Sequence, residues 1–232
     1  MSPADLFVLV VVAAAVVVRP VLGWRERRRG VTPGLGARLA YLCGATTLVG
    51  LAASLAGLQP ADAGLVVTSA WRMALITVAG VALVIAADAA GARALVRQPG
   101  LLNERTAALG AWVRGAAPGR LRLMIYIAGA AAYEEIVFRG LGLYLTTAFG
   151  LPLPIAVLLL ALAFGLQHSA GGWLGMGYAC LFGLFFSALY LAAGSLFAAV
   201  IAHAAGNAYT VLWTYPRLVR RLERRRAPAF LF

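Results

Sequence analysis

Two adjacent glutamates and an arginine lie in a stretch of sequence that is otherwise apolar enough to span a membrane. In "AAYEEIVFRG", Glu134 and Glu135 are followed by Arg139. A charged side chain at the centre of a bilayer costs about 3 kcal/mol, so such residues indicate a functional site. Glu135 and Arg139 are four residues apart and can neutralise each other on one helix face. Glu134 points about 100° away and is free for another role.

Both histidines of the chain also lie in apolar segments. "FGLQH" ends at His168 and places Phe164 one helical turn before it, and "HAAGN" places Asn207 one turn after His203. A carboxylate and a histidine can hold and deprotonate a water molecule. A second histidine and an amide can donate hydrogen bonds to an oxyanion. Together these groups are the parts of a site that hydrolyses amides.

The remaining acidic residues and the cysteines do not form a second such group. Cys43 and Cys180 lie in apolar segments without the paired spacing of a metal site. The other carboxylates all fall at span ends or in connectors, at Asp5, Glu26, Asp62, Asp88, Glu104 and Glu223. The candidate chemistry is therefore confined to the carboxyl-terminal half of the chain.

The composition predicts an all-α, polytopic membrane helix bundle. Of the 232 residues, 62% are hydrophobic, against roughly 45–50% in soluble domains. The chain lacks the alternating ten-residue segments of a membrane β-barrel. We predict seven spans of about 20 residues, at about 5–24, 38–58, 70–88, 121–147, 152–170, 173–193 and 195–216.

The basic residues predict the orientation of these spans. The net charge of +12 comes from 20 arginines and no lysine, concentrated after the first span, between the third and fourth spans, and after Pro216. Seven alternating spans place all three regions on one side, which should be the cytoplasm, with the amino terminus outside. No basic face carries interleaved aromatic residues, so we expect membrane lipids as partners and no nucleic acid.

The predicted organisation has three parts. Residues 1–120 hold three transmembrane helices and a cytoplasmic loop, in which 93–115 form either an interfacial amphipathic helix or a plain loop. Residues 121–216 hold a catalytic core of four helices, and residues 217–232 form a basic cytoplasmic tail.

The motifs of the core resemble those of a known family. "EEIVFR" fits E-E-x-x-x-R, "FGLQH" fits F-x-x-x-H and "HAAGN" fits H-x-x-x-N. In this order, on successive membrane helices, they resemble the CPBP family of intramembrane proteases, which includes type II CAAX prenyl endopeptidases and bacterial Abi-like proteins. The resemblance covers about 121 to 216, and the first three spans carry no motif of this family.

The resemblance implies a role for each matching residue. Glu134 would be the catalytic base that activates a water molecule, and His168 would hold that water. Glu135 and Arg139 would position the site. The mechanism is either a metal-free glutamate mechanism or a metal-dependent one.

The last helices would supply the rest of the site. His203 and Asn207 would stabilise the tetrahedral intermediate, and Phe164 would be a structural or substrate-binding residue. A zinc ion would take Glu134, His168 and His203 as ligands, although the chain has no H-E-x-x-H motif. Counted from the outer helix ends, His203 lies ~12 Å deep and His168 ~24 Å deep, so a shared water requires tilted helices or shifted boundaries.

The sequence thus favours a bacterial inner-membrane endopeptidase that cleaves a membrane-anchored or lipidated protein or peptide. The all-arginine composition indicates a bacterial source with a GC-rich genome. Two alternatives stay open. Deep carboxylates and histidines could form the proton relay of a transporter, or the chain could be a non-catalytic immunity or assembly factor on the same scaffold.

Overall fold

The computed structural model describes residues 3–28, 34–97, 119–169 and 172–226. These residues form helices and no strands, which confirms the predicted all-α class. The elements are α1 (Pro3–Arg28), α2 (Leu35–Leu55), α3 (Ala70–Arg97), α5 (Arg120–Glu135), the π-helical segment η3 (Ile136–Leu141), α6 (Gly142–Ala148), α7 (Leu153–Gln167), α8 (Gly172–Ala193), α9 (Leu196–Tyr209), the π-helical segment η5 (Thr210–Thr214) and α10 (Tyr215–Arg226).

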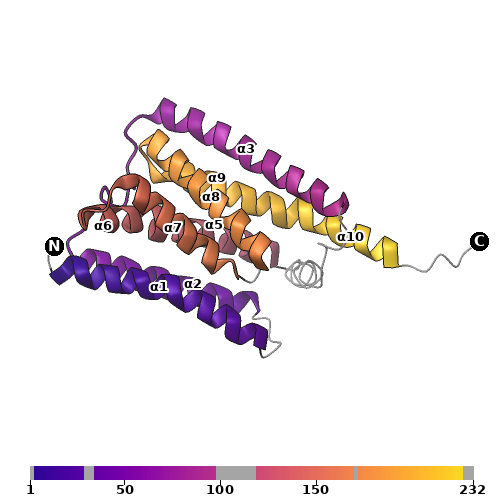
Figure 1. The fold of residues 1–232 in the computed structure, drawn as a ribbon, viewed down its shortest axis with the longest axis horizontal. Helices are drawn as coiled ribbons and strands as arrows, with labels where there is room; N and C mark the ends of the chain where they lie inside the picture. Colours follow the sequence, from indigo (N-terminus) through magenta and orange to yellow (C-terminus); the bar gives the residue numbers. More distant parts are fainter. Residues whose placement is uncertain (1–2, 29–33, 98–118, 170–171, 227–232) are drawn as a thin grey trace, which may run out of the picture.

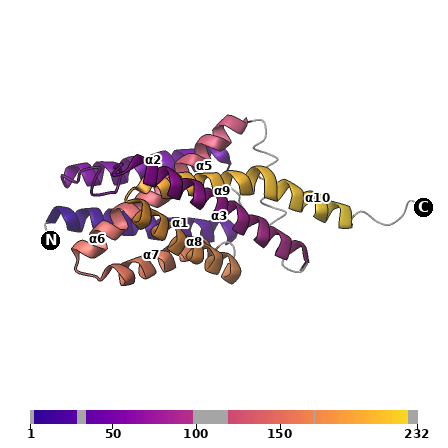
Figure 2. The same ribbon diagram turned by 90° about the horizontal axis from the view of Figure 1, so that it is seen from above.

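The helices form a bundle in which the motif-bearing helices lie in the middle. The antiparallel pair α1 and α2 covers one side, where α1 packs on α7 and α2 packs on α5 (Figure 1). On the other side α3 packs along α9 and α8. In the view from above, α9, η5 and α10 form one long continuous rod that projects at the carboxyl-terminal end (Figure 2). The seven motif residues therefore lie between two covering layers.

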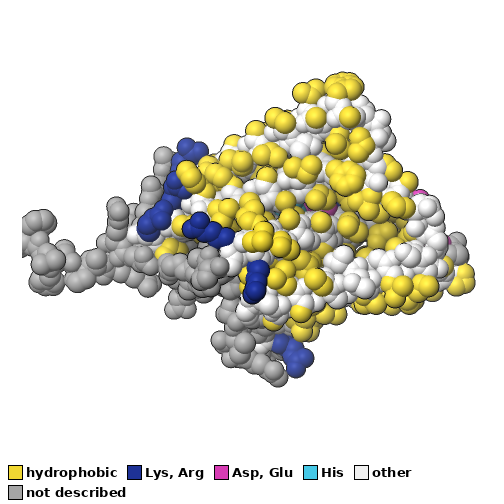
Figure 3. All heavy atoms as spheres, turned by 180° about the vertical axis from the view of Figure 1, so that it is seen from behind, with side chains coloured by type: hydrophobic (Ala, Val, Ile, Leu, Met, Phe, Trp, Pro, Cys, Tyr) yellow, Lys and Arg dark blue, Asp and Glu magenta, His cyan; other side chains and the backbone are white. Residues whose placement is uncertain are grey.

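The outer surface of this bundle is apolar. Four of the described helical stretches are long and apolar enough to cross a membrane: Leu35–Leu55, Ala70–Ala94, Gly172–Ala193 and Leu196–Arg220. Large side chains such as Leu55, Trp71 and Val78 are about 70% exposed, and hydrophobic atoms cover most of the face in Figure 3. Such a surface is stable in lipid and not in water. These features confirm a helical membrane bundle.

The helices extend beyond several of the predicted spans. The expected span 121–147 covers α5, η3 and α6, so a π-helical segment lies within it. The third helix runs on past residue 88 to Arg97, and the last continues through η5 and α10 to Arg226. The length of an apolar run indicates which part of a helix lies in the bilayer. The helix itself can be longer, because its backbone hydrogen bonds also form outside the bilayer. The predicted amphipathic segment falls largely on residues 98–118, outside the described part of the chain.

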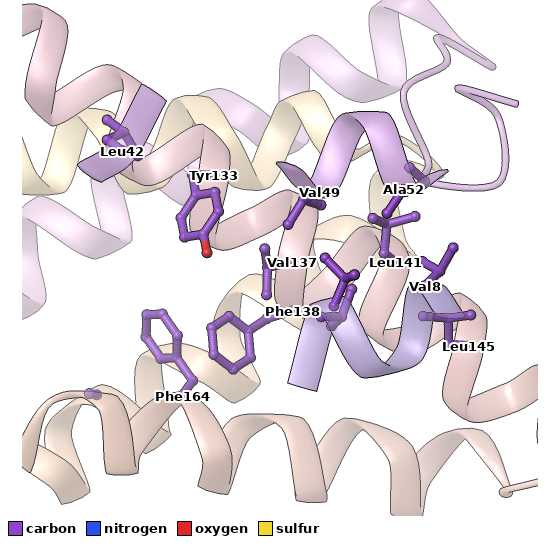
Figure 4. Packing of buried hydrophobic residues seen from close by; sticks show 14 residues of the cluster. Val8, Leu42, Val49, Ala52, Tyr133, Val137, Phe138, Leu141, Leu145 and Phe164 are labelled. Carbon is purple, nitrogen blue, oxygen red and sulfur yellow. The ribbon is translucent and has the colours of Figure 1, made fainter. Parts of the chain in front are cut away.

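The largest buried cluster surrounds η3 and α6. Val8 of α1 and Val49 of α2 meet Leu141 and Leu145 there (Figure 4). The connector between α2 and α3 closes this end, since an added Cβ on Gly140 would lie 2.7 Å from the carbonyl oxygen of Ala63. This close backbone approach fixes the π-helical segment against the rest of the fold.

Candidate functional site

The two glutamates lie where α5 changes into the π-helical segment. Glu134 and Glu135 are the last residues of α5, and Arg139 lies in η3. Single π-helical turns are rare in proteins overall, and those that occur are often found at functional sites. Because a π-helix has more residues in each turn, Arg139 lies nearly above Glu135 along the axis. The local backbone therefore favours the contact between these two side chains.

Arg139 is a fully buried cation with three kinds of partner. Its Nη1 donates to Glu135 Oε1 at 3.0 Å, and its Nη2 donates to the carbonyl oxygen of Gly183 in α8 at 3.0 Å. Its guanidinium carbon lies 4.4 Å from the centroid of the Phe164 ring. The predicted Glu135–Arg139 pair is confirmed, and the additional partners offset the desolvation of a buried ion pair.

His203 lies between the two glutamates. Its Nδ1 is 2.7 Å from Glu135 Oε1, and its Nε2 is 3.6 Å from Glu134 Oε2. Its ring stacks on Phe186 of α8, with centroids 4.6 Å apart and planes 14° apart. An ionised Glu135, which already accepts from an arginine, accepts a hydrogen bond from Nδ1–H. The other ring nitrogen then faces Glu134.

Glu134 is the accessible carboxylate of this group. Its side chain is 20% exposed, whereas that of Glu135 is fully buried. The 3.6 Å between Glu134 Oε2 and His203 Nε2 is longer than a direct hydrogen bond. One small polar group of a substrate can therefore contact both atoms. A carboxylate with that access can act as a general base.

The structure brings the second histidine motif to the same place. His168 caps the end of α7, and its Nδ1 lies 2.9 Å from the carbonyl oxygen of Phe164. The Phe164 ring lies 4.7 Å from the His168 ring and 6.0 Å from the His203 ring, centroid to centroid. Both imidazoles therefore flank one phenyl ring. The two histidines therefore lie close together, although the sequence led us to expect them at very different depths in the membrane.

Phe164 and Asn207 complete the predicted set. Phe164 is 2% exposed and meets Phe138 edge to face at 5.2 Å, as Figure 4 shows. It is thus a packing residue that supports both histidines, in agreement with the structural part of its expected role. Asn207 is partly buried in α9, one turn after His203. The ionic contact of Glu134 in this structure is to His203 rather than to His168.

The sequence did not predict the contribution of α8. Gly183 supplies the carbonyl oxygen that Arg139 uses, and Ser187 Oγ donates to the same oxygen at 2.9 Å. Phe186 supplies the face on which His203 stacks. The only signal is the four-residue spacing of Gly183 and Ser187 in "FGLFFS", which places a small residue and a hydroxyl on one helix face.

We expect Gly183→Ala to destabilise the protein by about 1–3 kcal/mol, since overfilling a packed core costs that much. The new Cβ would lie 3.0 Å from Ala161 Cα and 3.2 Å from Arg139 Nη2. Thermal unfolding in detergent measures the effect. Gly177→Ala in the same helix is the matched control, because no atom lies within 4 Å of its added Cβ. Equal melting temperatures of the two variants would contradict the close approach.

The described part of the chain does not assemble a zinc site. No group of three or more His, Cys, Asp or Glu side chains there is placed to hold a metal ion. Glu134 Oε2 and His203 Nε2 are 3.6 Å apart, and the Nδ1 atoms of His203 and His168 contact Glu135 and the carbonyl oxygen of Phe164. These contacts leave the Nε2 atom of each imidazole available, as in metal-binding histidines. The expected ligand set Glu134, His168 and His203 is not brought together in this arrangement.

The α3 helix is tied to the helix that carries His203. Asp88 accepts hydrogen bonds from the hydroxyl groups of Thr210 and Thr214 in η5. Thr210 also donates to the carbonyl oxygen of Gly206, one turn earlier in the chain. The backbone hydrogen-bond pattern changes at a π-helical turn, so carbonyl oxygens there can accept from side chains. Asp88 was expected at a span end, and in the structure it lies within α3 and holds the second π-helical segment.

Comparison with known proteins agrees with the motif-bearing half. Residues 117–209 match the family model described as type II CAAX prenyl endopeptidase Rce1-like. The match spans α5, η3, α7 with the His168 that follows it, and α9, which together carry all seven motif residues, and it confirms the resemblance found from the motifs. At family level it supports a CAAX-type intramembrane endopeptidase. No curated protein and no solved structure matches the chain.

Proposed function

We propose that this membrane protein, whose residues 117–209 are similar to the type II CAAX prenyl endopeptidases, is an intramembrane endopeptidase. It hydrolyses a peptide bond of a membrane-anchored or lipidated protein or peptide. The observation that carries the proposal is the placement of His203 between Glu134 and Glu135, with Arg139 behind them. The location is the bacterial inner membrane, with the amino terminus outside.

Glu134 is the base in the proposed reaction. Its carboxylate takes a proton from water, and the resulting hydroxide attacks the carbonyl carbon of the scissile peptide bond. The tetrahedral intermediate then collapses, and the protonated Glu134 returns the proton to the departing amine. The products are a carboxylic acid, which gives its proton to water, and an amine, and the carboxylate of Glu134 is regenerated. Its 20% exposure and its 3.6 Å separation from His203 support this role.

His203 stabilises the negative charge that develops on the carbonyl oxygen in the proposed reaction. When it is protonated, its Nδ1–H donates to Glu135 and its Nε2–H can donate to the oxyanion. The charges of Glu134, Glu135, Arg139 and His203 then sum to zero, which suits a buried site. Asn207, one turn further along α9, supplies a second donor. Glu135 and Arg139 hold the imidazole in place.

The proposal is tested with purified protein in lipid nanodiscs and a fluorogenic peptide library anchored close to the membrane. We expect His203→Ala and His168→Ala each to lower kcat by at least about 100-fold, the usual contribution of an acid–base or oxyanion group. Variants that retain the wild-type melting temperature give the valid comparison. Full activity of His203→Ala would refute the proposed site, and full activity of His168→Ala would refute the role of His168 alone.

A further inference from the structure

A cavity lies beyond the glutamates, between α3 and the η5–α10 segment. Its volume is about 220 Å³, its surface is mainly apolar, and it is lined by Ala89, Ala92, Arg93, Tyr209, Trp213, Thr214, Arg217 and Leu218. Tyr209 follows His203 by six residues, or about 9 Å of helix. The cavity is therefore separate from the proposed catalytic group, and none of the seven motif residues lines it.

Two arginines from different helices line this cavity. Arg93 of α3 donates through Nε to the carbonyl oxygen of Ala89, and Arg217 of α10 donates through Nη1 to that of Trp213, both at 3.1 Å. The guanidinium carbon of Arg217 also lies 3.3 Å from the centroid of the Trp213 ring. Each cation is thus held by one N–H, which leaves other N–H groups for a ligand.

One carboxylate lies beside the cavity. Asp88 accepts hydrogen bonds from Thr210 and from Thr214, and Thr214 lines the cavity; these neutral hydroxyl groups leave the negative charge of Asp88 in place. Among the described residues, the ion pairs of the structure involve neither Arg93 nor Arg217. The two arginines therefore have no direct carboxylate partner in the described chain, and together with Asp88 they leave the local charge positive.

The cavity also lies at the basic end of the bundle. Arginines gather at one end of the face in Figure 3, the end from which α10 projects. Trp213, which lines the cavity, is 52% exposed, and it stacks with Tyr209 at 6.4 Å. Tryptophan, tyrosine and arginine together mark the boundary between hydrocarbon and headgroups. The ligand of this cavity is therefore to be sought at headgroup depth.

We propose that the cavity binds the phosphate headgroup of an anionic phospholipid. Arg93 and Arg217 hold the phosphate, as basic pockets between transmembrane helices do on the cytoplasmic side. Ala89, Ala92 and Leu218 give the cavity an apolar wall, which suits the glycerol and first acyl carbons of a lipid. A free phosphate ion makes no use of that wall, so the geometry points to the lipid. The bound lipid would also link α3 to α10.

The test measures lipid-dependent thermal stability of the purified full chain in detergent micelles. We expect dioleoyl-phosphatidylglycerol to raise the melting temperature and to bind more tightly than dioleoyl-phosphatidylcholine. One arginine near an anionic headgroup is worth roughly five-fold in affinity, so Arg93→Gln with Arg217→Gln should weaken phosphatidylglycerol binding about 30-fold. Native mass spectrometry of the same samples counts bound lipids.

Arg122→Gln is the matched control, because Arg122 is an exposed arginine at the start of α5 and does not line the cavity. It should bind the lipid as the wild type does. Equal lipid affinities of the double variant and the control would overturn the proposal, as would equal stabilisation by the two lipids. Stabilisation by inorganic phosphate as large as that by phosphatidylglycerol would also overturn it, in favour of a free-anion site. None of these outcomes depends on proteolytic activity.

Discussion

Replacing Glu134 by glutamine is expected to lower peptide cleavage by roughly 10²–10⁴-fold, the usual contribution of a general base. The amide keeps the size of the side chain but cannot take a proton from water. Glu134 is 20% exposed, and its closest ionic contact is to His203 at 3.6 Å. Fold stability should therefore change little, and the loss should appear in kcat.

The measurement is cleavage of the best peptide from the library by wild type and variant in matched nanodiscs. Asp62→Asn is the control, because it removes a carboxylate that accepts a hydrogen bond from the backbone N–H of Gln59 in the connector between α2 and α3. It should cleave at the wild-type rate. Wild-type cleavage by a folded Glu134→Gln variant would rule out Glu134 as the base, whereas no cleavage of any library peptide by the wild type itself would favour the non-catalytic alternative. Loss of ion-driven uptake in vesicles would instead favour a transporter.

Replacing Arg139 by methionine is expected to destabilise the fold by about 3–5 kcal/mol, since it leaves an uncompensated buried charge. Arg139 and Glu135 are both 0% exposed. Without the guanidinium, Glu135 Oε1 keeps only the contact to His203, and the carbonyl oxygen of Gly183 loses its charged donor. The midpoint of thermal unfolding in detergent should fall by many degrees.

A second substitution separates the charge effect from the loss of volume. Glu135→Gln in the Arg139→Met background removes the unpaired charge, so we expect the double variant to regain at least half of the lost stability. Replacing a buried ion pair by neutral side chains of similar size is often close to neutral. A double variant as unstable as the sum of its single changes would show that the two side chains act independently. That outcome would contradict the neutralising role of the pair.

The features predicted correctly from the sequence are those that follow from short-range periodicity. The share of apolar residues is a property of each segment, so it predicted a helical membrane bundle. The Glu135–Arg139 contact was predictable because residues four apart share a helix face whatever packs around them. The motif residues were also identified in advance, and the family match covers the helices that carry them.

The partner of each glutamate was decided by the tertiary structure. Glu135 and His203 are 68 residues apart in sequence, yet their atoms lie within 2.7 Å. The spacing of residues within one helix cannot predict which face of a second helix packs against it, because helix packing depends on the tilt and register of both helices. The resemblance implied that His168 holds the water beside Glu134, and the structure adds His203 as an ionic neighbour of that carboxylate.

The contacts that α8 makes with the candidate site were also decided by the tertiary structure. Gly183 and Phe186 lie in an apolar helix, where the spacing of Gly183 and Ser187 is the only sign that one face differs from the others. Only close packing of α8 on α7 and α9 brings a glycine carbonyl to Arg139 and an aromatic face to His203. The sequence by itself determined which charges had to be buried, and the packing of the helices determined what each of them touches, because lipid-facing and core-facing apolar residues are chemically alike.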